Sequence, residues 1–148
     1  FVKLGLSNHW YSTILPCICM ELTTSIFLVR SYVDTIPREL EEAASIDGSS
    51  FTRTLLLLIL PLIKPVVVTC GIISFFHVWN EFPFSLILFS NEKDYTLPLM
   101  LMRFKGEYFT DYPRVMTSLF VSIIPALVIY SLFSKQIIKG MMAGAIKG

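Results

Sequence analysis

The chain has 148 residues, of which 54% are hydrophobic and only 16% carry a charged side chain. Its mean hydropathy of +0.67 is well above that of an ordinary soluble domain, so the first interpretation is a membrane protein. The net charge of +1, with both histidines neutral, gives no support for binding nucleic acid or another polyanion.

Three cysteines, Cys17, Cys19 and Cys70, lie inside apolar stretches. An odd number of cysteines without a nearby histidine favours small buried hydrophobes over a disulfide framework or a metal site. The chain begins with Phe1 and not with methionine, and its pattern of apolar and polar segments starts partway through. We therefore expect the C-terminal part of a longer protein.

The first predicted membrane span covers about residues 10–29, with Trp10 and Tyr11 at one end and Arg30 at the other. Glu21 interrupts it. An ionisable group inside a span is costly and usually faces a bundle interior or water, which makes Glu21 a candidate functional residue. The alternative is a protonated or hydrogen-bonded packing residue.

A loop of about residues 31–61 follows, and its first part predicts two short helices joined at a turn. Pro37 precedes the amphipathic segment 38–44, whose acids lie near the positive end of the helix dipole. Gly48 can adopt a positive φ, and Ser49 or Ser50 can cap the next helix. Such a bracket suits docking to a partner, although a solvated acidic loop has the same composition.

The second predicted span covers about residues 65–88, after an apolar run at 55–63. Pro61 and Pro65 are expected to bend or break the helix before the span proper. Four polar or aromatic residues gather in the outer third of the span: His77, Trp79, Asn80 and Glu81. They resemble a set that contacts sugars or forms a gate, but interfacial anchoring by Trp79 is equally compatible.

The outer loop, residues 90–112, predicts one short helix near 99–104. The third span is expected at about 115–133, where Pro125 is tolerated because neighbouring helices can satisfy the freed carbonyl. Residues 135–148 then form a tail. Three spans place the two ends of the chain on opposite sides of the membrane.

Positive charge selects the orientation. One side of the membrane would hold seven basic residues: Arg30, Arg38, Arg53, Lys64, Lys135, Lys139 and Lys147. The other side would hold five: Lys3, Lys93, Arg103, Lys105 and Arg114. The excess predicts that the bracket and the C-terminus are cytoplasmic.

A longer motif runs through the bracket. It has a Glu-Ala-Ala triplet, three residues, a glycine, nine residues and a closing Leu-Ile-Leu-Pro, and it comprises Glu42, Ala43, Ala44, Asp47, Gly48, Leu60 and Pro61. This spacing resembles the EAA signature of ABC-importer permeases, particularly the carbohydrate-type, MalG-like group. Other segments resemble the same group: 36–40, 79–82, 95–98 and the tail 140–148.

The resemblance implies an all-α membrane protein, a polytopic helix bundle of the type I ABC importer permease kind, with three transmembrane helices in this chain. Residues 1–134 would be the C-terminal part of a permease domain of about six helices, followed by the cytoplasmic tail 135–148. The location implied is a bacterial or archaeal inner membrane. The function implied is import of a sugar or related carbohydrate, with this subunit forming half of the pathway.

The implied partners are separate ABC ATPase subunits docked at the EAA loop, a second permease subunit, an extracytoplasmic solute-binding protein and membrane lipid. The chain itself would be no enzyme, with no catalytic residue, metal or cofactor, because ATP and Mg²⁺ would be bound by the ATPase subunits. Alternatives are a permease fragment that only docks the ATPase, or an importer of a non-sugar solute. An intramembrane enzyme using Glu21 and His77 is disfavoured, because the chain lacks motifs such as His-Glu-x-x-His and Gly-x-Ser-x-Gly.

Overall fold

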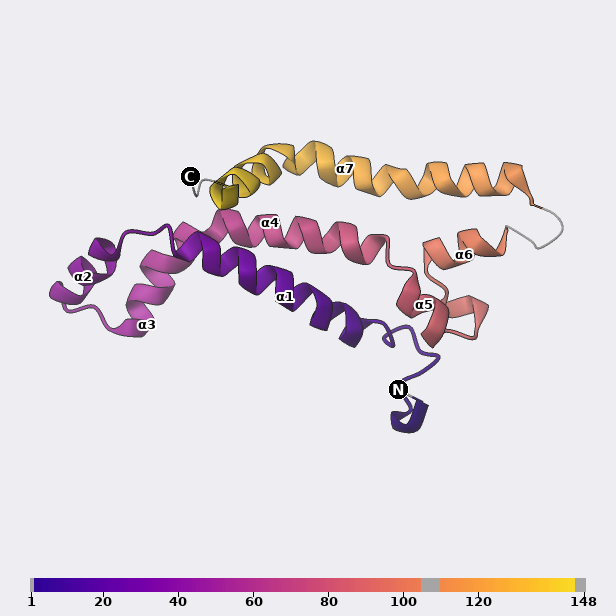
Figure 1. The fold of residues 1–148 in the computed structure, drawn as a ribbon, viewed down its shortest axis with the longest axis horizontal. Coiled ribbons are helices and arrows are strands. Elements are labelled where there is room, and N and C mark those ends of the chain that lie inside the picture. Colours follow the sequence, from indigo (N-terminus) through magenta and orange to yellow (C-terminus); the bar gives the residue numbers. More distant parts are fainter. Residues whose placement is uncertain (1, 105–109, 146–148) are drawn as a thin grey trace. The chain divides into compact units, whose positions relative to one another are not determined.

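The computed structural model describes residues 2–104 and 110–145. Within these residues the elements are all helical (Figure 1). Residues 105–109 of the outer loop and 146–148 of the tail lie outside the described part. The chain divides into two compact units, one of residues 1–21 with 74–132 and the other of residues 22–73 with 133–148.

Helix α1, Ile14–Val33, corresponds to the first predicted span but is displaced toward the C-terminus relative to residues 10–29. Its start is delayed because the chain turns first: the backbone N–H of His9 donates to Ser12 Oγ at 3.0 Å, and Asn8 has a φ of 61°. Arg30 does not end the helix, since Tyr32 and Val33 pack against a buried cluster.

The bracket consists of α2, Arg38–Ile46, and α3, Phe51–Thr54. Pro37 lies just outside α2 in an extended conformation, and the predicted positive φ at Gly48 is confirmed at 74°. Of the two candidate capping serines, Ser50 caps α3, with its side chain accepting from the backbone N–H of Arg53 at 3.4 Å.

Of the two outcomes expected at Pro61 and Pro65, a bend or a break, the structure excludes a break. The segment Phe51–Trp79 is one run of helix: α3, a π-helical turn η2 at Leu55–Ile59, and α4 at Leu60–Trp79. A proline removes one backbone donor and crowds the preceding turn. The wider π-helical turn directly before Pro61 changes the hydrogen-bond register there, which lets the helix continue.

The predicted limit of the second span at residue 88 is also corrected, because α4 ends at Trp79 and a separate helix α5, Pro83–Leu88, follows. The Asn80 side chain donates to the carbonyl of Phe76 at 2.7 Å. Pro83 then starts α5, a position where proline is favoured in a new helix.

The core of the second unit lies between α1 and α4. Its buried residues are Ile59, Ile63, Val66 and Cys70, and they contact half-buried side chains of α1 and the following turn: Leu28, Val29, Tyr32, Val33 and Ile36. Thr69, 2% exposed, donates its hydroxyl to the carbonyl of Pro65 at 3.0 Å. This hydrogen bond satisfies the buried hydroxyl of Thr69 with a backbone acceptor.

In the first unit, α5 is followed by a short 3₁₀ turn η3, Glu92–Asp94, and by α6, Leu97–Arg103. The helix predicted near 99–104 is therefore confirmed with a slightly earlier start. Asn8 fixes the end of α5: its backbone N–H donates to Leu88 at 3.0 Å, and its side chain accepts from Ser90 at 2.6 Å.

Helix α7, Tyr112–Ala145, contains the third predicted span and continues into the predicted tail, with Pro125 inside it. Among the described residues, three helical segments are long and apolar enough to cross a membrane: Ile14–Val33, Phe51–Trp79 and Tyr112–Ser134. Many of their large apolar side chains are exposed, among them Phe27, Leu57 and Phe120. Such surfaces are suited to lipid or to other membrane helices.

Candidate functional sites

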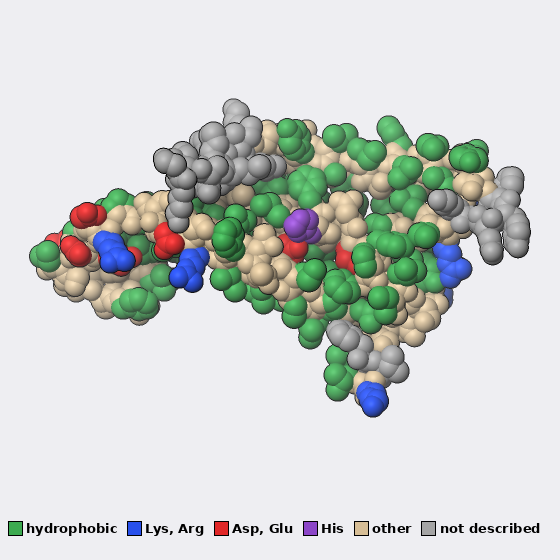
Figure 2. Space-filling model, in the orientation of Figure 1, with side chains coloured by type: hydrophobic (Ala, Val, Ile, Leu, Met, Phe, Trp, Pro, Cys, Tyr) green, Lys and Arg blue, Asp and Glu red, His purple; other side chains and the backbone are tan. Residues whose placement is uncertain are grey.

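The bracket presents an exposed surface that mixes acids with large apolar side chains. Glu42, Ala43 and Asp47 are exposed, whereas Ala44 is half-buried. Ile46 is 85% exposed and Phe51 is 83% exposed. Figure 2 shows acidic and basic side chains gathered over α2 and α3 at one end of the view. Exposed apolar groups beside charges are typical of a contact surface.

The turn between α2 and α3 is a Schellman motif. The backbone N–H of Ser49 donates to Ala44 at 2.9 Å, and that of Gly48 donates to Ser45 at 3.1 Å. This pattern requires a left-handed residue at the Gly48 position. The hydroxyl of Thr54 donates to Ser49 Oγ at 3.0 Å and ties α3 to the turn. The angle of the bracket is therefore set by backbone geometry at Gly48.

The closing residues of the motif, Leu60 and Pro61, lie in the first turn of α4 and are exposed. Their neighbours Ile59 and Ile63 are buried against α1. The motif thus joins the bracket to the helix that forms the core of the second unit.

A second polar site surrounds Glu21 on α1. Ser74 on α4 donates its hydroxyl to Glu21 Oε2 at 2.6 Å, and Nδ1 of His77 lies 2.9 Å from Glu21 Oε1. The Glu21 side chain is 16% exposed, whereas that of His77 is 59% exposed. A carboxylate within an apolar helix is costly unless it is paired, at about 2.5–3.5 kcal/mol at the centre of a span on insertion scales. Ser74 and His77 offset this cost.

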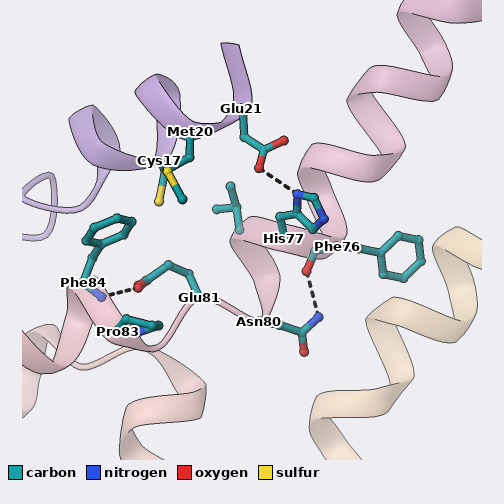
Figure 3. Close-up of a pocket in the computed structure, with 10 residues that line it drawn as sticks. Cys17, Met20, Glu21, Phe76, His77, Asn80, Glu81, Pro83 and Phe84 are labelled. Atoms are coloured by element: carbon teal, nitrogen blue, oxygen red, sulfur yellow. Dashed lines mark hydrogen bonds and ion pairs between the residues drawn. The ribbon is translucent and has the colours of Figure 1, made fainter. Parts of the chain in front are cut away.

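This cluster forms one wall of a pocket with a volume of about 460 Å³, within the range of small-molecule sites. Besides Glu21 and His77, its lining includes Cys17, Asn80, Glu81 and Phe84. In Figure 3, Glu21 and His77 face each other from α1 and α4, while Cys17 and Phe84 lie on the other side of the pocket.

Glu81 has a structural role in this pocket. Its carboxylate accepts from the backbone N–H of Phe84 at 2.5 Å and from that of Ser85 at 3.2 Å. The hydroxyl of Ser85, which is fully buried, donates to the same group at 2.5 Å. Glu81 therefore caps the first turn of α5, which leaves it little capacity for a ligand.

Trp79 does not line the Glu21 pocket. Its indole N–H donates to the carbonyl of Ser122 on α7 at 3.1 Å, and its ring stacks on Phe75 with centroids 5.7 Å apart. It lines a different hollow, together with Thr96 and Leu97. The side chain of Trp79 therefore lies outside the pocket that Asn80 and Glu81 line.

Sequence reasoning missed the pairing of Glu21 with His77. A signal for it existed, because an ionisable group inside a span usually finds another one, and His77 is the one basic residue within the next predicted span, 65–88. The register of the two helices, which decides the pairing, is set by packing that no single span reveals.

A family model described as "Binding-protein-dependent transport system inner membrane component" matches residues 1–142. The chain belongs to this family. Among its relatives, a protein of Caldicellulosiruptor sp. named as an ABC transporter permease, ORF2, is 42% identical over 146 residues, covering 99% of this chain and 53% of the relative.

Several relatives carry names that include a solute, among them the following two. The multiple sugar-binding transport system permease protein MsmG of Streptococcus mutans is 37% identical over 98% of this chain and 53% of its own length. The trehalose/maltose transport system permease protein MalG of Thermococcus litoralis is 34% identical over 99% of this chain and 53% of its own. The chain spans about half the length of these relatives.

Proposed function

We propose that the chain is part of a permease subunit of an ATP-driven importer, in which it helps to form the pathway for a sugar or related carbohydrate. Family membership and the match over residues 1–142 support the permease role. The names of MsmG and MalG support sugars as the solute class. In this role the chain moves solute and catalyses no reaction, while ATP and Mg²⁺ are bound by separate ATPase subunits.

The observation that carries the coupling role is the exposed bracket. Glu42 and Ile46 are one turn apart on α2, so a single face offers a carboxylate and a large apolar side chain. Phe51 adds a second exposed apolar group directly after the turn. We assign this surface to the ATPase subunit, with the apolar groups providing contact area and Glu42 pairing with a basic residue.

This proposal places the bracket and the C-terminus in the cytoplasm of a bacterial or archaeal cell, in agreement with the excess of basic residues on that side. On the outer side, a solute-binding protein delivers the solute, and a second permease subunit completes the pathway. Movement of the ATPase subunits shifts the bracket, and Gly48 transmits this shift to α3 because its motif fixes the angle between α2 and α3.

A charge reversal tests the coupling role. Glu42→Lys is expected to reduce copurification of the ATPase subunit with the membrane-inserted permease about tenfold or more, because it replaces an attractive charge contact with a repulsive one. The matched control is Glu41→Lys, which changes an exposed acid on the same helix by the same amount but on an adjacent face. Equal loss in both variants, or loss in neither, contradicts the assignment of Glu42.

The solute class is tested by uptake. The complete transporter is reconstituted into liposomes with its solute-binding protein, and ATP-dependent entry of radiolabelled trehalose, maltose, melibiose and raffinose is measured. Uptake of at least one of these sugars is expected. ATP-dependent uptake of a non-sugar solute with none of the sugars entering would contradict the sugar assignment while leaving the permease role intact.

A further inference from the structure

The pocket beside Glu21 has an open polar wall. His77 pairs with Glu21 through Nδ1, yet its side chain is 59% exposed, and its Nε2 has no hydrogen-bond partner among the described residues. A hydrogen-bonded pair that only joined two helices would be expected to lie buried between them, away from any pocket. Here the pair instead contributes to the lining of a cavity.

The chemistry of the lining indicates the class of ligand. Among its described residues there is no Lys or Arg, which disfavours an anionic solute. Glu21 already accepts from Ser74 and pairs with His77, and Glu81 accepts from three donors at the start of α5, so neither carboxylate is unpartnered. What remains are hydrogen-bonding groups beside apolar surface.

The hydroxyl groups of a solute could form hydrogen bonds with the polar residues that line this pocket. A carboxylate oxygen of Glu21 can accept from a solute hydroxyl, and Nε2 of His77 can also accept, because Nδ1 of the same ring carries the proton donated to Glu21. The side-chain oxygen of Asn80 is a further acceptor, because its amide nitrogen already donates to Phe76. The ring of Phe84 offers an apolar face of the kind that stacks on the C–H face of a sugar.

We propose that Glu21 and His77 are direct hydrogen-bonding contacts of a binding site for a neutral polyhydroxylated solute, lined also by Cys17, Asn80 and Phe84. In this site Ser74 is a positioning residue, since it holds Glu21 in place through a 2.6 Å hydrogen bond. The inference rests on the proposed function, because it takes the transported sugar as the occupant of the pocket. It assigns the contact to Glu21 and His77, and gives Trp79 and Glu81 structural roles.

The natural cysteines provide a direct test. Cys17 lines this pocket, whereas Cys19, two residues away on α1, lines a different hollow. In one form of the permease Cys17 is the one cysteine kept within this chain, through Cys19→Ser and Cys70→Ser, and in the control form Cys19 is the one kept. In the complete transporter in lipid nanodiscs, alkylation by N-ethylmaleimide is followed with and without a sugar that the uptake assay has shown to be imported.

Sugar is expected to slow alkylation of Cys17 and to leave alkylation of Cys19 unchanged. Adding Glu21→Gln to the first form is expected to raise the sugar concentration for half-protection about tenfold or more, the loss expected for one hydrogen bond to a charged group. Ser74→Ala should shift it by less, because Glu21 keeps its charge. Protection of Cys17 is measured before any change at Glu21, so it does not depend on whether that variant folds.

Two outcomes overturn the inference: an imported sugar that does not protect Cys17, or protection that Glu21→Gln leaves unchanged. Either result leaves the proposed import function standing, because uptake of the same sugar has been measured independently. Equal protection of Cys17 and Cys19 also contradicts a local site, since it indicates a change in the exposure of α1 as a whole.

Discussion

Gly48 offers a quantitative test of how the bracket works. Its φ is 74°, and a Cβ built at this position would meet no atom within 4 Å. Substitution therefore costs backbone strain alone, without a steric clash. For an L-residue other than Asn or Asp this strain is about 1–2 kcal/mol, so the population of the observed turn should fall about five- to thirtyfold.

Three substitutions at Gly48 are expected to introduce increasing amounts of this backbone strain. Gly48→Asn should be tolerated, because Asn adopts the left-handed region more readily than most residues. Gly48→Ala should be intermediate, and Gly48→Val should be the most damaging because its side chain is β-branched. Gly71→Ala is the matched control, since Gly71 lies within α4 at an ordinary helical φ with open space around its Cβ, where alanine is favoured by about 1 kcal/mol.

The assay compares two quantities in the reconstituted transporter: solute-stimulated ATP hydrolysis, and solute imported per ATP hydrolysed. The amount of permease inserted in the membrane is measured for each variant, since the spans do not depend on this turn. Coupling should fall in the order Asn, Ala, Val, with Gly71→Ala unchanged. If Gly48→Val coupled as well as the unmodified permease, the left-handed turn would have no part in transmission and the reasoning would be refuted.

Two further predictions concern stability, measured as the thermal unfolding of the detergent-solubilised permease by fluorescence-detected chromatography. Glu81→Ala should destabilise it by about 1–3 kcal/mol, because the buried Ser85 loses its acceptor; the exposed control Glu92→Ala should have little effect, and equal effects would contradict the capping role. Ile63→Ala should cost about 2–5 kcal/mol by opening a cavity in the core, whereas Ile46→Ala should leave stability unchanged and weaken ATPase copurification. A stability loss at Ile46 would show that it packs within the chain.

The sequence predicted the local structure of the bracket well because that structure depends on near neighbours. A proline before an acidic segment, a glycine and two serines suffice to place α2, a left-handed turn and a capped α3. Hydrogen bonds at these positions span only a few residues, as in the bond from Ser49 to Ala44. Tertiary packing is not needed to specify them.

The errors in the second span have a different origin. Pro61 and Pro65 were expected to bend or break the helix; the helix is unbroken, and a π-helical turn at Leu55–Ile59 precedes Pro61, a feature of which an apolar run gives no sign. The end of the span was placed too late because hydropathy continues from Trp79 into the apolar helix α5. The acceptor that starts α5 is Glu81, and its hydrogen bonds to Phe84 and Ser85 are not indicated by hydropathy.

The two candidate sites meet in one element. The helical segment Phe51–Trp79 begins directly after the Ser50 cap of the bracket and also carries Ser74 and His77. Its π-helical turn lies between these two parts, and the irregular hydrogen bonding of such turns often coincides with functional positions. Within the proposed coupling role, a change of register in this π-helical turn would be the step that carries a displacement of the bracket into the segment Phe51–Trp79.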